Sequence, residues 1–170
     1  MGLLQGAGVE ELVDVRRYPA SRRHPHFNQG PLAEALEAAG IAYRHTEILG
    51  GRRGRPAADS PNTAWRSESF QAYADHLATD EAREALAELR AGAEGGRRLC
   101  LLCAEKVPWH CHRQLLADVL ALQGVEVRHL VDPDRELSHS PNPAATLSPD
   151  GVVTYPAGAG PQGDLFDAGE

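Results

Sequence analysis

A cysteine, a carboxylate and a Cys-His-Arg run lie within a short stretch of the sequence. Cys103 lies near the end of a nearly continuous apolar run, residues 98–104, which is typical of a strand covered on both faces. Cys111, His112 and Arg113 then open a segment whose apolar spacing predicts a helix. A helix N-terminus and a nearby guanidinium group both favour the thiolate. The spacing therefore favours Cys103 as a nucleophile or redox thiol, with a buried, inert thiol as the alternative.

The neighbours of Cys103 offer matching roles. Glu105 can act as a general base or as the partner of an arginine. Backbone amides at the start of the helix suit an anion, and Arg113 adds a fork of donors. The alternative is that Arg113 pairs with Asp14 or Glu105 as a structural tie.

Three known chemistries can be compared with this spacing. Phosphatase-like loops place an arginine six residues after the nucleophilic cysteine, but Trp109 holds that position after Cys103. Zinc sites prefer spaced ligand pairs, whereas His110, Cys111 and His112 are adjacent, so we predict no metal. A reversible disulfide between Cys103 and Cys111 is the third option, and it requires their Cα atoms to lie within about 7 Å of each other.

Alternating strands and helices must position these groups. Hydrophobic spacing and glycine or proline punctuation predict strands at 11–16, 41–45, 98–104 and 125–130, and helices at 31–39, 69–77, 80–89 and 111–123. Strands joined through helices indicate parallel crossover connections. We therefore expect an α/β fold, a three-layer sandwich with a mostly parallel sheet.

Charged or nucleophilic side chains stand at each predicted strand end. In open α/β sheets, ligands bind beyond the carboxyl ends of the strands. We therefore expect one site at this edge, although strand ends are also simply where solvent begins. The residues concerned are Asp14 and Arg16, Arg44 and His45, Cys103 and Glu105, and Arg128 and His129.

Two loops carry arginines that suit an anion. The first contains Arg22, and the second, residues 47–66, contains Gly50, Gly51 and Arg52. Glycine-rich loops can approach phosphates closely, and the alternative is an exposed basic loop. The net charge of −7 does not exclude a phosphorylated ligand, because a local basic site can sit inside an acidic protein.

Composition limits the organisation and the compartment. No segment reaches the roughly 18 apolar residues of a membrane helix, and no signal peptide is evident, so we expect a soluble, cytoplasmic protein without membrane binding. Three clustered cysteines fit a reducing compartment. The 170 residues divide into an α/β domain at 1–131 and a flexible tail, rich in proline and glycine, at 132–170.

A resemblance to a bacterial family rests on motifs that occur in order between residues 9 and 130. They are Val13-Asp14-Val15-Arg16, Pro19 with Ser21-Arg22, Phe27, Gly40-Ile41-Ala42-Tyr43-Arg44-His45, Leu49-Gly50-Gly51-Arg52, Phe70 with Tyr73-Ala74, Leu102-Cys103-Ala104-Glu105 and Cys111-His112-Arg113. Together they resemble domain of unknown function 488 (DUF488). The resemblance implies a small α/β fold without a settled activity. Members of this family begin with a further strand and helix carrying a Gly-His-Ser turn, so the resemblance also implies a domain truncated at its N-terminus.

The tail ends with a second recognisable pattern. Gln162, Leu165 and Phe166 resemble the Gln-x-x-Leu-Phe peptide with which bacterial DNA-maintenance enzymes bind the replication sliding clamp. A disordered tail can present two apolar side chains to a pocket. The alternative is that these residues dock on their own domain or bind nothing.

The leading hypothesis is an enzyme acting on a nucleotide, nucleic-acid or other phosphorylated ligand, with a role in DNA maintenance and an unknown cofactor. Its catalytic residues are Cys103, Glu105, Asp14 and His45. Its ligand-binding residues are Arg16, Arg22, Gly50, Gly51, Arg52, Cys111, His112 and Arg113. The alternatives are a non-enzymatic nucleotide or nucleic-acid module recruited to the clamp, and a structural protein whose polar strand ends pair internally.

Overall fold

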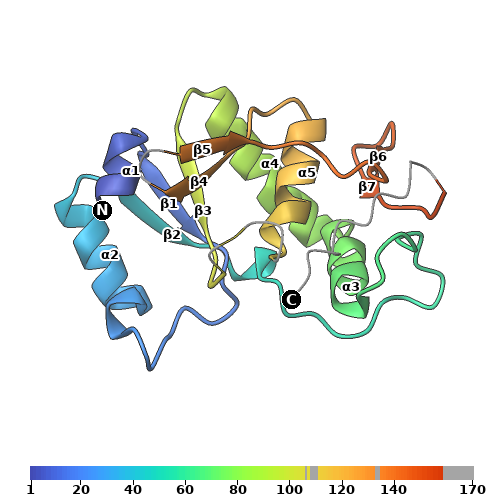
Figure 1. Ribbon diagram of the computed structural model, residues 1–170, viewed down its shortest axis with the longest axis horizontal. Coiled ribbons are helices and arrows are strands. Elements are labelled where there is room, and N and C mark those ends of the chain that lie inside the picture. The colour runs from blue at the N-terminus through green and yellow to red at the C-terminus, as the bar shows by residue number, and fades with distance from the viewer. Residues whose placement is uncertain (106, 108–110, 133–134, 159–170) are drawn as a thin grey trace.

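A three-stranded parallel sheet forms the centre of the computed structural model, which describes residues 1–105, 107, 111–132 and 135–158. The strands β1 (Glu11–Asp14), β2 (Ala42–His45) and β3 (Leu99–Leu102) lie in the order β2-β1-β3 (Figure 1). Every residue of the central strand β1 is buried. A strand covered on both faces in this way is typical of parallel sheets.

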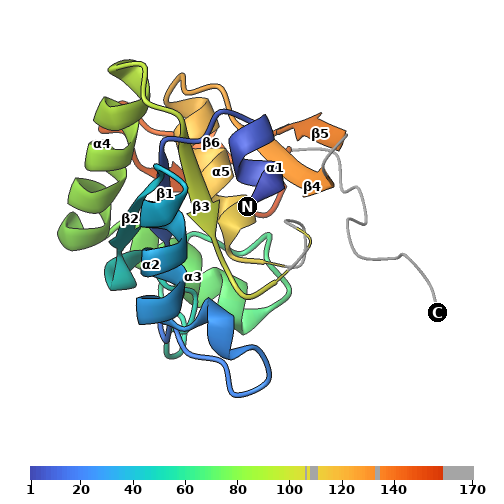
Figure 2. The same ribbon diagram turned by 90° about the vertical axis from the view of Figure 1, so that its left-hand side faces the viewer.

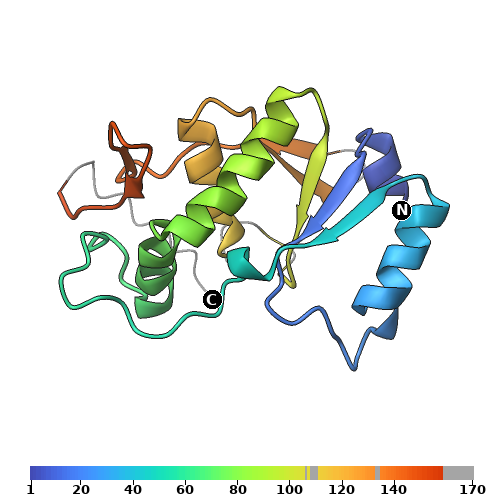
Figure 3. The same cartoon turned by 180° about the vertical axis from the view of Figure 1, so that it is seen from behind.

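Helices cover both faces of this sheet. On one face, α2 (Gln29–Ala38) packs Leu32 and Leu36 against the sheet, and the short α1 (Gly2–Gly6) lies nearby (Figure 2). The other face carries α3 (Glu68–Leu77), α4 (Asp80–Glu94) and α5 (Arg113–Leu122), as Figure 3 shows from behind. The predicted three-layer α/β sandwich with a parallel sheet is confirmed. Within the described residues, no helix has the length and apolarity needed to cross a membrane.

Local sequence signals set the helix ends. The Thr79 hydroxyl accepts a hydrogen bond from the Ala82 amide at 3.4 Å and caps α4, whose first turn carries Asp80 and Glu81. Beyond α5, Gly124 has a φ of 91°, a left-handed conformation that favours glycine. The 3-10 turns at Pro25–Phe27 and Glu47–Leu49 interrupt the two loops on the carboxyl side of the sheet.

The fourth predicted strand does not join the parallel sheet. Residues Arg128–Asp132 form β4, which pairs antiparallel with β5 (Arg135–Ser138) in a separate two-stranded ribbon. The strand begins with Arg128 and ends with Asp132, both exposed, and none of its residues is fully buried. Such partial exposure suits an antiparallel pair better than a strand buried on both faces. The expectation that Arg128 and His129 mark a parallel strand end was therefore wrong.

The packed domain also extends beyond the boundary predicted at residue 131. Strands β6 (Thr146–Leu147) and β7 (Val153–Thr154) form a hairpin, and Val153 and Tyr155 are buried in the core beside α3 and α5. The segment is held by a buried carboxylate on α5, because Asp118 accepts hydrogen bonds from the Tyr155 hydroxyl and the Asn142 amide at 2.9 and 3.0 Å. The sequence after residue 131 has little apolar periodicity, so it gave no signal that this segment packs on the domain. The remainder of the predicted tail, 159–170, lies outside the described residues.

Removing the Tyr155 side chain is expected to destabilise the domain. Tyr155 is 1% exposed and Tyr18 is 63% exposed, so Tyr155→Ala and Tyr18→Ala form a matched pair. Tyr155→Ala should lower the free energy of unfolding by about 3–5 kcal/mol, because it opens a cavity in the core. Tyr18→Ala should change it by less than about 0.5 kcal/mol. Urea denaturation of both variants measures the difference, and equal effects would contradict the packing of this segment.

Candidate active site

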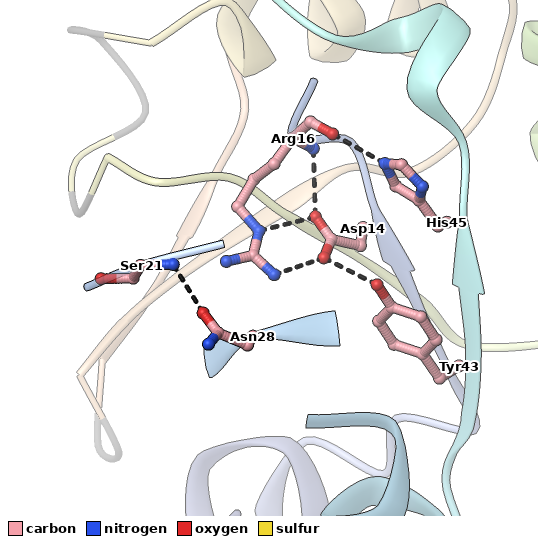
Figure 4. Close-up of polar contacts among 6 residues, drawn as sticks. All are labelled: Asp14, Arg16, Ser21, Asn28, Tyr43 and His45. Carbon is pink, nitrogen blue, oxygen red and sulfur yellow. Dashed lines mark hydrogen bonds and ion pairs between the residues drawn. The ribbon is translucent and has the colours of Figure 1, made fainter. Parts of the chain in front are cut away.

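The hydrogen bonds at the carboxyl edge of the sheet fall into two clusters. One is built around Asp14, the last residue of β1, and takes side chains from β2 (Figure 4). The other is built around Cys103, which follows β3, and Cys111, which precedes α5. The sheet thus brings Cys103 and Asp14 to the same edge, as predicted from strand polarity, but into separate bonding clusters.

The first cluster is a closed ion pair. Asp14 is fully buried, and the Arg16 guanidinium binds its carboxylate through two parallel bonds, Nε at 2.8 Å and Nη2 at 2.5 Å. The Tyr43 hydroxyl donates to the same carboxylate at 2.9 Å (Figure 4). Burial, reinforced by the Asp14 carboxylate, raises the pKa of Tyr43, and the hydrogen bond to Asp14 raises the pKa of Arg16. Arg16 therefore serves mainly as the internal partner of Asp14.

The loop after β1 is anchored to this cluster. His45 Nε2 donates to the Arg16 carbonyl at 2.8 Å, and the Asn28 side chain accepts the Ser21 amide at 2.6 Å (Figure 4). The contact found for His45 therefore positions the backbone. Arg22, on the same loop, is exposed.

The second cluster consists of two thiols, an imidazole and a guanidinium group. The sulfur atoms of Cys103 and Cys111 lie 3.0 Å apart, and Nδ1 of His112 lies 3.7 and 3.6 Å from them. Arg113 donates to Cys111 Sγ through both its backbone amide and its Nε, each at 3.4 Å. Arg113 Nη2 also donates to the Glu105 carbonyl at 2.5 Å, which fixes the loop leaving β3.

These donors decide which sulfur carries the negative charge. The hydrogen bond between Cys103 and Cys111, followed by the donors of Arg113, lowers the pKa of Cys111 to about 6 against the opposing effect of burial. The same hydrogen bond, together with burial, raises the pKa of Cys103 to about 12. The pair therefore shares one proton, and the two Arg113 donors favour Cys111 as the charged sulfur. The sequence singled out Cys103 as the activated thiol, whereas the geometry makes Cys111 the thiolate and leaves Cys103 as the more exposed sulfur, since Cys111 is 2% exposed.

The loop after β2 packs tightly over this cluster. A Cβ atom on Gly51 would overlap the His112 ring, and one on Gly50 would lie 2.9 Å from the Arg17 backbone. The Tyr73 ring meets His112 edge-on at 5.0 Å, and its hydroxyl donates to the Leu49 carbonyl at 2.7 Å. Gly50 and Gly51 thus permit close packing of the loop, which is a structural reason for the glycines that the sequence associated with phosphate.

The remaining predicted residues lie at the surface of the domain or outside the residues that the structure describes. The Arg52 side chain is exposed, and its carbonyl accepts Arg17 Nη1 at 3.2 Å. Glu105 is exposed, and the contact found for it is made by its backbone carbonyl. The residues Gln162, Leu165 and Phe166 of the predicted clamp peptide lie outside the described part of the chain.

The second cluster also offers ligands for a soft metal ion. The donor atoms of Cys103, Cys111 and His112 all lie within 4.8 Å of one another. Two sulfurs bound to one tetrahedral zinc ion would be about 3.8 Å apart, given Zn–S bonds of about 2.3 Å. The observed separation of 3.0 Å is shorter, so this arrangement fits a shared proton better than a shared ion.

Sequence reasoning missed two partners. The first is Tyr43, whose hydroxyl donates to Asp14. Successive side chains of a strand point to opposite faces of the sheet, so Tyr43 and Arg44 lie on different faces of β2. Asp118 is a carboxylate among the buried apolar residues of α5. A charge on the buried face of a helix was the available signal for it.

The thiol pair should titrate well below an ordinary cysteine. Because Arg113 and Cys103 stabilise the Cys111 thiolate, the ultraviolet thiolate absorbance should rise with an apparent pKa of about 6 in the reduced protein. Cys111→Ser should abolish this step, and Arg113→Gln should move it upward. Cys100→Ser, the control, should keep it, because burial raises the pKa of Cys100. A first thiolate appearing only near the ordinary cysteine pKa would contradict the hydrogen bonding described.

Breaking the Asp14–Arg16 pair should cost stability. Asp14→Asn leaves the Arg16 guanidinium buried without its carboxylate, so the free energy of unfolding should fall by about 3–5 kcal/mol in urea titrations. Asp59→Asn, at an exposed position, is the control and should have little effect. A fully stable Asp14→Asn protein would show that the ion pair does not hold this edge together.

Comparison with known proteins identifies the family to which the chain belongs. No curated protein and no solved structure gives a significant match to the chain. A family model described as "Domain of unknown function DUF488" matches residues 1–120, more than half of the chain. The predicted resemblance is confirmed, and the chain belongs to the DUF488 family.

Proposed function

We propose that this protein is a dithiol oxidoreductase in which Cys103 and Cys111 alternate between a thiol pair and a disulfide. The observation that carries the proposal is the 3.0 Å separation of the two sulfurs, one of which is stabilised as a thiolate by Arg113. A low-pKa thiol beside a second thiol is the arrangement used in thiol–disulfide exchange.

The two thiols take different roles because their exposures differ. The shared proton passes from Cys103 to Cys111, and the Cys103 thiolate attacks one sulfur of a substrate disulfide. The first substrate thiolate leaves and takes the proton from Cys111. The Cys111 thiolate then attacks the Cys103 sulfur and displaces the second substrate thiolate. The protein pair loses two electrons and becomes a disulfide, and the substrate disulfide gains them and becomes one thiol and one thiolate, which takes its proton from solvent.

The surroundings favour an anionic substrate. Arg17 contacts the glycine loop that packs on His112, and Arg52 follows this loop, so positive charge lies on the segment that covers His112. Arg52 is exposed and Arg17 is half-buried, and guanidinium groups bind carboxylates and phosphates. We therefore propose small disulfides bearing carboxylate or phosphate groups as the substrate class, which retains the anionic ligand that the sequence predicted. Action on nucleic acid and binding to the sliding clamp stay predictions.

Oxidised glutathione provides a direct test because it is an anionic disulfide. Incubation with the reduced protein should form a Cys103–Cys111 disulfide, identified by peptide mass mapping. Cys111→Ser should stop at a glutathione adduct on Cys103, because the attacking second sulfur is missing. Cys103→Ser should form little adduct, since Cys111 is buried. Cys100→Ser is the matched control and should behave as the unmodified protein.

Two results would exclude the proposal. Adducts that accumulate on Cys100 in place of Cys103 would show that the pair is not the reactive centre. A stable mixed disulfide on Cys103 in the unmodified protein would show that Cys111 does not resolve it.

A further inference from the structure

A second polar chain lies away from the thiol pair, between α5 and the β4–β5 ribbon. His139 Nε2 bonds to the Asp118 carboxylate at 2.8 Å, and His139 Nδ1 bonds to His129 Nε2 at 2.9 Å. Asp118 is fully buried and His139 is 4% exposed, whereas His129 is half-buried. Two imidazoles in line behind a buried carboxylate form a path along which a proton can move.

The hydrogen bonds fix the direction of this path. The Asp118 carboxylate can only accept, and it already accepts from Tyr155 and Asn142, so His139 Nε2 must carry a proton. In neutral His139, Nδ1 is then the acceptor, and His129 Nε2 donates to it. The remaining ring nitrogen of His129, Nδ1, therefore carries the lone pair. Burial, with the nearby His139 and Arg113, lowers the pKa of His129 to about 4 against the opposing effect of Asp118, so this lone pair is free at neutral pH.

His129 also borders a cleft of about 640 Å³ between β3 and the α5–β4 region, two segments that Figure 1 shows close together. Its volume falls in the range of small-molecule sites. Apolar side chains, among them Leu101, Leu120 and Val127, line part of it. The rest of the lining is charged or ionisable: His129, the arginines Arg97, Arg98, Arg113 and Arg128, and the carboxylates Glu94, Glu126 and Glu136. Apolar walls with a few polar groups that fix orientation are common in sites for small molecules.

We propose that this cleft binds a small, mainly apolar molecule with an acidic hydroxyl group, and that His129 removes the hydroxyl proton through the Asp118–His139–His129 relay. His129 Nδ1 takes the proton from the hydroxyl oxygen, and the Nε2 proton of His129 passes to His139 Nδ1. The positive charge then rests on His139, against the Asp118 carboxylate. The negative charge on the ligand oxygen is stabilised by the electrostatic field of Arg113.

The relay explains how so weak a base can work. His129 alone would hold a proton poorly at neutral pH. The relay moves the positive charge to the inner ring, whose Nε2 lies 2.8 Å from the Asp118 carboxylate. The charge therefore ends beside a buried carboxylate and not on the outer ring. This site uses neither Cys103 nor Cys111, although it shares Arg113 with the thiol pair.

4-Nitrophenol is a suitable probe, because it is apolar and its phenolate absorbs visible light. At a slightly acidic pH, where the free probe is mainly protonated, the intact protein should bind it and increase the phenolate band. His129→Gln should abolish the increase, and His139→Gln should reduce it by about tenfold or more, equivalent to about one pKa unit. His24→Gln, at an exposed position on a distant loop, is the matched control and should match the unmodified protein.

Nitrogen NMR of the histidine rings tests the relay without any variant. Both rings should carry their proton on Nε2 in the free protein, with His129 Nδ1 unprotonated. A proton on His129 Nδ1 at neutral pH would overturn the proposal, as would a phenolate band that persists in His129→Gln or that never forms. If His139→Gln does not fold, the NMR result and His129→Gln still decide between these outcomes.

Discussion

The stabilisation of a negative charge on Cys111 is the interaction around which the carboxyl edge of the sheet is arranged. A thiolate that is 2% exposed must be compensated by its surroundings, since burial of an unpaired charge is costly. The Cys103 sulfur lies 3.0 Å away, and the amide and guanidinium group of Arg113 supply two donors. Because these contacts come from the end of β3 and the start of α5, the charge joins the sheet to the helix layer.

Two buried carboxylates hold the surrounding framework in the same manner. Asp14 ties the loop after β1 to β2 through Arg16 and Tyr43, and Asp118 ties α5 to the segment that follows β5 through Tyr155, Asn142 and His139. Each carboxylate accepts several donors, so neither is left with a bare buried charge. The polar groups at the edge therefore divide into structural ion pairs and one pair of close thiols. The ion pairs agree with the internally paired network that was one alternative from the sequence, and a reactive centre at the thiols stays a proposal.

Features set by short-range patterns could be predicted from the sequence, and features set by pairing could not. The parallel strands, the helix cap at Thr79 and the closeness of Cys103 to the start of α5 follow from periodicity, capping and strand polarity. The antiparallel pairing of β4 and the burial of Tyr155 depend on contacts between segments that have no periodic signal. Which of the two sulfurs, Cys103 or Cys111, carries the negative charge depends on a few ångströms in the positions of the Arg113 donors, which spacing along the chain does not specify.

The rate of alkylation at each cysteine tests the central claim most directly. With the reduced protein, iodoacetamide and mass mapping near neutral pH, the account predicts that the Cys103–Cys111 pair is modified faster than Cys100, and that Arg113→Gln slows the pair while leaving Cys100 unchanged. Modification of all three cysteines at the same slow rate, with no effect of Arg113→Gln, would show that no stabilised thiolate exists at this edge.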